Sequence, residues 1–312
     1  MRPNSRNEGM KFLDLHIHGA FGVDPLNADV AELDRLAQGL EARGYGSFLP
    51  TLIPLELDRL EPVVERLVEW KASRIARDGR GAMPLGLHFE GPFLSPVQAG
   101  ALDPAHLLDG SDDRVVSRWL SLMDQLVGHN MITIAPEIKG GLDLIREMRR
   151  RGFLVSLGHT DAGIEDLERA VDAGARHMTH FCNAMRPLHH RQSGPIDFGL
   201  LSDQLSIDLI ADGHHLSRPM MELILKVKNP AKIVLISDAI PATGQGDGVH
   251  EIWGETITVA GGTARNASGA LSGSIALLQE GVTTLTALGL SRAAALACAS
   301  SNALAALRAE QD

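Results

Sequence analysis

Cysteine is scarce in this sequence. Cys182 and Cys298 are the only two among 312 residues, and they form no spacing motif. Paired cysteines stabilise many small secreted domains, so this scarcity excludes a disulfide framework and favours a reducing compartment. The chain also lacks an apolar run of ~18 residues that could cross a membrane, and its first 12 residues are too polar for a signal peptide. We therefore expect a cytoplasmic protein with no membrane partner.

Basic residues are outnumbered by acidic ones. The chain has 29 Lys and Arg against 39 Asp and Glu, a formal net charge of −10. Nucleic acids are polyanions, so this balance argues against a nucleic-acid partner. The one strongly basic run, residues 146–152, is typical of the end of a surface helix, where cations are favourable. The length and the hydrophobic content of 44% suit a single domain, which we expect to cover residues 1–312.

Short β-rich runs alternate with longer helical patterns along most of the chain. Eight such runs occur, at residues 11–17, 47–52, 84–89, 131–136, 154–158, 177–181, 206–212 and 233–238. Between them, apolar residues recur at three- and four-residue steps, as in amphipathic helices, notably at 29–44, 57–79 and 141–152. This order predicts an α/β fold, a (β/α)8 barrel over about residues 11–250. A doubly wound open sheet is the alternative, but no Gly-rich dinucleotide fingerprint follows the first run.

The chain beyond the last run predicts a smaller appendage, at about residues 251–309. Residues 251–273 predict a hairpin that turns at "AGGT". Two helices, over 274–289 and 291–309, are expected to complete the chain. No linker, low-complexity segment or second domain is evident.

Metal-ligand side chains gather where the β-rich runs end. "DLHIHG" (14–19) ends the first run with two histidines two positions apart, which point to the same side of a strand. The strand ends of a barrel meet at one rim, which brings six side chains together: His16, His18, Glu90, His159, His180 and Asp238. Four imidazoles and two carboxylates suit zinc or iron(II) rather than magnesium or calcium. We therefore expect one or two divalent ions per chain, with zinc favoured.

The position of each ligand on the rim suggests its role. The histidine pair on the first run would bind one ion with Asp238 close by, while His159 and His180 would bind a second or share the first. Glu90 is placed to bridge them. A bound metal lowers the pKa of its water toward ~7, and a carboxylate beside that water can take the proton and pass it to a leaving group. Asp238 is therefore the candidate catalytic residue for hydrolysis at a carbonyl or phosphoryl centre.

For three other polar residues near the rim, a structural role competes with a functional one. His88 shares a strand face with Glu90, and we expect it behind the ligands or in the core. His177 is expected in the core, because it precedes His180 by three positions and points elsewhere. Glu137 either contacts substrate or metal or forms a structural ion pair.

Several motifs occur in an order that resembles one enzyme family. They are "DLHIHGAFGVD" (14–24), "GLHFEGPFLSP" (86–96), "APE" (135–137), "SLGHTDA" (156–162), "THFCNAM" (179–185), "ADGHH" (211–215), "SDA" (237–239) and "GALSGS" (269–274). Together they resemble the N-acetylglucosamine-6-phosphate deacetylases of the amidohydrolase superfamily, over about residues 12–305. The combination of "HFEGPF" and "THFCNAM" is far more specific than a histidine pair alone.

The resemblance implies an amide hydrolase that removes the acetyl group from an N-acetyl amino sugar, with N-acetylglucosamine 6-phosphate as the expected substrate. It implies that Glu90, His159 and His180 form the main metal site and that the H-x-H pair holds an optional second ion. Asp238 would activate water and then protonate the amine. The resemblance also implies a homodimer with a phosphate site shared across its interface, and these substrate-binding residues: Asn183, Ala184, Arg191, His215 and Leu271.

Three departures from the family pattern leave alternatives open. The chain lacks the segments at both ends that build the family's flanking β-sandwich. Leu102 stands where a polar residue usually helps to polarise the acetyl carbonyl, and "RQSG" (191–194) replaces the usual "REPG". The alternatives are an amidohydrolase-type barrel acting on a different amide, lactone or phosphoester, a nuclease-like barrel among them, or a non-catalytic sugar-phosphate-binding relative.

Overall fold

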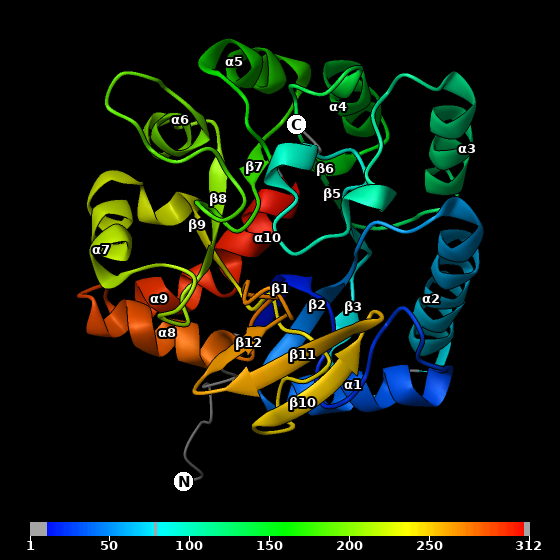
Figure 1. The fold of residues 1–312 in the computed structure, drawn as a ribbon. Helices are drawn as coiled ribbons and strands as arrows, with labels where there is room; N and C mark the ends of the chain where they lie inside the picture. Colours follow the sequence, from blue (N-terminus) through cyan, green and yellow to red (C-terminus); the bar gives the residue numbers. More distant parts are fainter. Residues whose placement is uncertain (1–10, 78–79, 309–312) are drawn as a thin grey trace, which may run out of the picture.

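Eight parallel strands form a barrel whose first and last strands meet (Figure 1). The computed structural model describes residues 11–77 and 80–308. A bridge between Ile17 and Ala239 joins the two ends of the sheet, and β3 (Met83–Pro84) pairs with β2 at its side. In ring order the strands are β1 (Phe12–Ile17), β2 (Tyr45–Leu52), β4 (His88–Glu90), β5 (Asn130–Ile134), β6 (Phe153–Leu157), β7 (His177–Met178), β8 (Ser206–Ile210) and β9 (Ile233–Ile236). The expected (β/α)8 barrel is confirmed, and the open doubly wound sheet is excluded.

A helix follows each strand of the ring, and together these helices surround the barrel (Figure 1). Their apolar faces cover the outside of the strands. At the start of the first helix, Asp29 and Glu32 form a reciprocal capping box. These helices are α1 (Val30–Ala42), α2 (Leu57–Arg77), α3 (Asp113–Met123), α4 (Gly141–Arg150), α5 (Ile164–Ala173), α6 (Pro195–Leu201), α7 (Arg218–Val227) and α8 (Leu278–Ala287). No helix in the described ranges combines the length and apolar character that a membrane span requires.

The C-terminal helices close one end of the barrel. Two helices were expected here, but three are present, because α9 (Arg292–Cys298) and α10 (Ser301–Arg308) are separate. The break lies at Ala299, whose carbonyl accepts a hydrogen bond from the Leu13 amide of β1 at 2.9 Å instead of continuing a helix. Ala303 and Leu307 of α10 then pack against the apolar side chains inside the barrel. The site is therefore confined to the opposite end, where the strands finish.

A small antiparallel sheet replaces the single predicted hairpin. Its strands are β10 (Gly248–Ile252), β11 (Glu255–Ala260) and β12 (Thr263–Arg265), and the predicted "AGGT" turn joins the last two. The first two are joined at Trp253 and Gly254, whose φ angles of 57° and 82° are both positive. This is the pattern of a type I′ hairpin turn. Figure 1 shows this sheet in front of β1 and β2.

Some predicted boundaries differ from the structure. The run 84–89 is not one strand but β3 and β4, because Gly86 between them approaches the His129 carbonyl so closely that a Cβ atom would lie 1.8 Å from its oxygen. The sixth predicted run, 177–181, is shorter in the structure: β7 ends at Met178, since the chain turns at once into a segment with positive φ angles. The N-terminal residues 1–10 on which the signal-peptide prediction rests, and the ends of the helices expected to reach 79 and 309, lie outside the described residues.

Candidate metal centre

The six predicted ligand side chains lie together at the rim of the barrel. They come from the ends of five strands or from the residues just after them: His16, His18, Glu90, His159, His180 and Asp238. Three of them have positive φ angles, namely His159 at 46°, His180 at 28° and Asp238 at 51°. Non-glycine residues adopt this conformation at an energetic cost, and such residues cluster at functional sites. The backbone thus turns sharply after β6, β7 and β9 and directs these side chains inward.

One group of donors consists of Glu90, His159 and His180. The Nε2 atoms of the two histidines lie 3.1 Å and 3.0 Å from Glu90 Oε1, and 3.1 Å from each other. All three residues are buried. Two imidazole nitrogens and a carboxylate oxygen therefore face one point, which is the arrangement of a first coordination shell.

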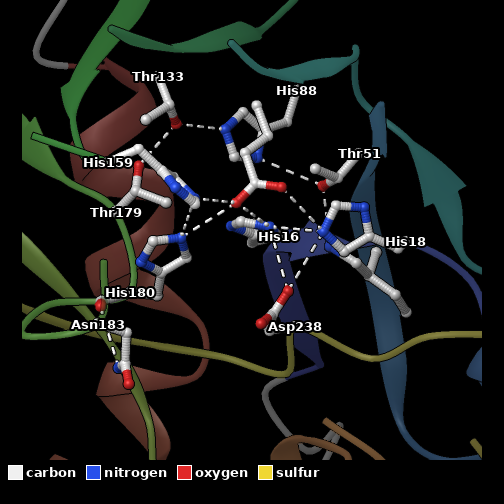
Figure 2. A network of polar contacts seen from close by, with 12 residues as sticks. His16, His18, Thr51, His88, Thr133, His159, Thr179, His180, Asn183 and Asp238 are labelled. Carbon is white, nitrogen blue, oxygen red and sulfur yellow. Dashed lines mark hydrogen bonds and ion pairs between the residues drawn. The ribbon is translucent and has the colours of Figure 1, made fainter. Parts of the chain in front are cut away.

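A second group lies beside the first and shares Glu90. The Nε2 atoms of His16 and His18 are 2.9 Å apart, and each lies 3.3 Å from Asp238 Oδ1. Glu90 Oε2 is 3.4 Å from His18 Nε2 and Glu90 Oε1 is 3.6 Å from His16 Nε2, so the carboxylate lies between the two histidine pairs. Figure 2 shows His159 and His180 on one side, His16 and His18 on the other, and Asp238 close to the second pair.

The donor set fits a divalent metal ion. His159 donates from Nδ1 to the carbonyl of Gln98 at 2.8 Å, which leaves the Nε2 lone pair free to face the centre. Metal-bound histidines are commonly oriented in this way by a backbone carbonyl. Imidazole nitrogens and carboxylate oxygens in a buried, closely spaced group are ligands that zinc and iron(II) accept. Each of the two groups offers three such donors.

The electrostatics of the donor set favour a positive charge at this centre. Burial alone would raise the pKa of Glu90, but the surrounding histidines hold it well below its usual value. Burial alone would lower the pKa of His18, but its contacts with Asp238 and Glu90 raise it to about 10. Burial lowers the pKa of neighbouring His16 well below its usual value. The carboxylates of Glu90 and Asp238 thus favour a cation beside these histidines, and metal and proton compete for the same nitrogen.

A layer of hydroxyl groups supports the ligands from inside the barrel. His88 lies between Thr51 and Thr133, at 3.3 Å and 2.9 Å, and its ring packs edge-on against His16 with centroids 4.6 Å apart (Figure 2). The predicted position of His88 behind the ligands agrees with this arrangement. Thr133 continues the network to Thr179 at 2.8 Å.

The other two residues with predicted structural explanations have polar partners of their own. His177 contacts Asp208 and Ser206, both at 2.6 Å, inside the barrel. Glu137 accepts hydrogen bonds from the Thr160 hydroxyl and the Asp161 amide, both at 2.6 Å, and so shapes the loop that follows His159. Neither residue contacts the two donor groups.

A pocket of about 460 Å³ opens over the predicted metal ligands. Of the predicted substrate-binding residues, four line it: Asn183, Ala184, His215 and Leu271. Leu102, the apolar departure from the family pattern, lines it as well. Arg191 does not line the pocket, and its side chain is exposed. Two features of the site were not predicted from the sequence. One is the carbonyl of Gln98, which orients His159 and has no side-chain signal. The other is Trp253, which lines the pocket from the small sheet.

Comparisons with known proteins point to one family. Residues 11–311 match the Amidohydrolase family. An N-acetylglucosamine-6-phosphate deacetylase of Bacillus subtilis is 39% identical over 86% of this chain and 67% of its own length. An N-acetylgalactosamine-6-phosphate deacetylase of Escherichia coli O157:H7 is 35% identical over 89% of this chain and 71% of its own length.

Solved structures give the same result. The N-acetylglucosamine-6-phosphate deacetylase of Thermotoga maritima matches with a TM-score of 0.84 and 31% identity, over 96% of this chain and 79% of that one. A mutant of the Mycobacterium smegmatis enzyme, in complex with N-acetyl-D-glucosamine-6-phosphate, matches with a TM-score of 0.84 and 32% identity, over 96% of this chain and 77% of that one.

Proposed function

Because this chain belongs to the amidohydrolase family and, within it, to the N-acetylglucosamine-6-phosphate deacetylases, we propose that it hydrolyses the acetyl amide of N-acetylglucosamine 6-phosphate. The products are acetate and glucosamine 6-phosphate. The observation that carries the proposal is the convergence of two histidine pairs on Glu90, with Asp238 beside them, on the wall of a pocket large enough for a sugar phosphate.

Glu90, His159 and His180 are proposed to hold the main metal ion. The proposed second ion is held by His16 and His18, with Glu90 between the two positions and Asp238 close to the second. A divalent cation at such a site polarises a carbonyl oxygen and lowers the pKa of water. We favour zinc, with iron(II) as the alternative, because the donors are mostly imidazole nitrogens.

Asp238 is the proposed general base and acid. Its carboxylate lies at the edge of the donor set and lines the pocket, so it can reach both a water molecule and the amide nitrogen. It takes a proton from the water as the oxygen bonds to the carbonyl carbon, and it returns that proton to nitrogen as the carbon–nitrogen bond breaks. Positioned proton transfer of this kind contributes roughly 10²–10⁴-fold to a rate.

The substrate is proposed to bind with its phosphate on the side of the pocket formed after β7 and β8. Asn183, Ala184 and His215 lie there, and Leu271 faces the pocket from the segment after β12. His215 is oriented by Asp212, which contacts its Nδ1 at 2.8 Å. The exposed Arg191 is proposed to reach the pocket of a second copy in a homodimer. We place the enzyme in the cytoplasm, where free thiols such as those of Cys182 and Cys298 persist.

The test is acetate release from N-acetylglucosamine 6-phosphate by protein loaded with zinc or with iron(II). The 4-epimer N-acetylgalactosamine 6-phosphate and unphosphorylated N-acetylglucosamine serve as comparison substrates. We expect the glucosamine derivative to give the highest kcat/KM and loss of the phosphate to raise KM. If protein with a confirmed content of one or two ions per chain gives no turnover with either zinc or iron(II), the proposal is wrong.

A further inference from the structure

Trp253 occupies a backbone position that disfavours it. It is the first residue of the turn between β10 and β11, where Trp253 and Gly254 both have positive φ angles. Such type I′ turns prefer Asn, Asp or Gly at this position, because a bulky side chain crowds its own backbone there. A strained residue persists where its surroundings hold it, and an observed outlier of this kind is a reason to look for a function. The turn alone therefore does not account for the tryptophan.

The indole ring of Trp253 forms a wall beside the metal centre. Its centroid lies 5.3 Å from that of the His18 ring, with the planes at 71°, and the side chain lines the pocket. The ring is half-buried and packs against both the barrel core and the core of the small sheet. It is thus held in place from two sides, as a rigid surface next to a proposed metal ligand.

Residues after β7 and β8 line one side of the pocket, and residues after β1 and β2 line another. Asn183 and His215 follow β7 and β8, whereas apolar Leu26 and Ile53 follow β1 and β2, together with polar Asn27 and Arg59. In the ring order, β2 and β7 are four strands apart in an eight-stranded barrel, so these two sides face each other across the metal centre. Trp253, which contacts His18 just after β1, belongs to the side formed after β1 and β2.

We propose that Trp253 is a specificity-determining residue that faces the N-acyl group and limits it to short chains such as acetyl. The inference rests on the proposed function. With the phosphate on the side formed after β7 and β8 and the amide carbon at the metal centre, the acyl substituent extends toward the apolar side chains of Trp253, Leu26 and Ile53. Apolar side chains suit a methyl group, and a rigid indole leaves no flexible end that could move aside for a longer chain.

The kinetic test compares N-acetyl- and N-butyryl-glucosamine 6-phosphate as substrates of wild type, Trp253→Asn and Trp253→Phe. Asn suits the first position of a type I′ turn, so Trp253→Asn removes the ring without opposing the fold. We expect wild type to favour acetyl over butyryl by at least about tenfold in kcat/KM, since added methylenes in a closed pocket are discriminated to this degree. Trp253→Asn should bring the two values within about threefold, and Trp253→Phe should retain most of the preference. An unchanged ratio in Trp253→Asn overturns the inference.

A binding measurement separates this inference from the proposed function. Trp70 and Trp119 are buried in α2 and α3, with 1% and 0% exposure, so a ligand in the pocket should perturb the fluorescence of Trp253. In metal-loaded Asp238→Asn, we expect N-acetylglucosamine 6-phosphate to shift the emission and glucosamine 6-phosphate, which lacks the acyl group, to shift it much less. Trp253→Phe in the same background should abolish the shift.

Different results contradict the placement of the acyl group and the proposed reaction. Equal shifts from both ligands, or none, contradict the placement of the acyl group even if wild type releases acetate. An acyl-dependent shift without acetate release from wild type supports the placement of Trp253 and contradicts the proposed reaction.

Discussion

Asp212 accepts a hydrogen bond from Nδ1 of His215 at 2.8 Å and is itself held by the Ser274 hydroxyl at 3.2 Å. Burial alone would raise the pKa of Asp212, but His215 lowers it to about 2, so the carboxylate is charged at neutral pH. The pair fixes the ring so that Nε2 of His215 is the nitrogen available to a ligand.

Removing the charge of Asp212 should weaken phosphate binding. We expect Asp212→Asn to raise the KM for N-acetylglucosamine 6-phosphate about tenfold or more, as the loss of a charged hydrogen bond does, with a smaller effect on kcat. Ser274→Ala, which removes only a neutral donor to the same carboxylate, should have a weaker effect. Steady-state kinetics check this, and an equal KM in wild type and Asp212→Asn would contradict it.

Asp238→Asn should abolish most of the turnover while leaving the main metal group intact. The amide cannot take a proton from water, so we expect kcat to fall by about 10²–10⁴-fold. Elemental analysis should still find the ion at Glu90, His159 and His180. Retention of kcat within a few-fold of wild type would remove Asp238 from the proposed role.

Loss of one ligand of the main group should release the metal. We expect His159→Ala to lower the bound zinc or iron and the activity together, because Glu90 and His180 alone leave a two-donor site. His129→Ala is the matched control, since this half-buried histidine lies away from the pocket. Chelation of wild type should remove activity, and adding zinc or iron(II) should restore it. Full metal content in His159→Ala is the opposing result.

Asp14, which lies two residues before His16 on β1, should make the metal-free protein less stable as the pH rises. Its Oδ1 accepts hydrogen bonds from the His16 and Ser237 amides, both at 3.2 Å, while Oδ2 has no such partner among the described residues. Burial raises its pKa to about 7. Between pH 4 and 7 the unfolded chain therefore loses this proton before the folded chain does, and unfolding becomes more favourable.

The comparison variant for this effect is Asp14→Asn, which cannot ionise. Relative to it, the free energy of unfolding of the chelated wild type should fall by roughly 4 kcal/mol between pH 4 and pH 7 and then level off. Denaturant unfolding at a series of pH values measures the difference. A difference that is constant across this range would show that Asp14 is ionised in the folded protein throughout.

Arg191→Ala should affect phosphorylated substrates selectively. If its guanidinium completes the phosphate site of a second copy, KM for the 6-phosphate should rise about tenfold or more, while the slow reaction of unphosphorylated N-acetylglucosamine stays the same. Sedimentation should show a dimer in both wild type and variant. A monomeric wild type, or an equal loss with both substrates, contradicts this arrangement.

The sequence predicted the barrel because each strand and helix carries its own periodicity. It could not predict the break at Gly86, which depends on the carbonyl of His129 just before β5. Nor could it predict the separation of α9 and α10, which depends on a hydrogen bond from Leu13 to Ala299 almost 300 positions away. Both features arise from tertiary contacts that leave no local pattern.

Most of the candidate site, like most of the fold, could be predicted from the sequence. The donors could be found because strand ends of a barrel share a rim, so that residues as distant as His16 and Asp238 fall into one group. The carbonyl of Gln98 could not be found, since every residue has one. Trp253 was missed because the position of the small sheet over the barrel is not encoded in its strand pattern.

The closure of the barrel and the second donor group depend on the same residue. The first group, Glu90, His159 and His180, needs no residue beyond position 180, whereas the contacts of His16 and His18 with Asp238 need the segment that follows β9. The Asp238 amide also donates to the His16 carbonyl at 2.9 Å, so this residue links the last strand to the first. A change that separates β9 from β1 would therefore remove Asp238 from the second group without removing any side chain of the first.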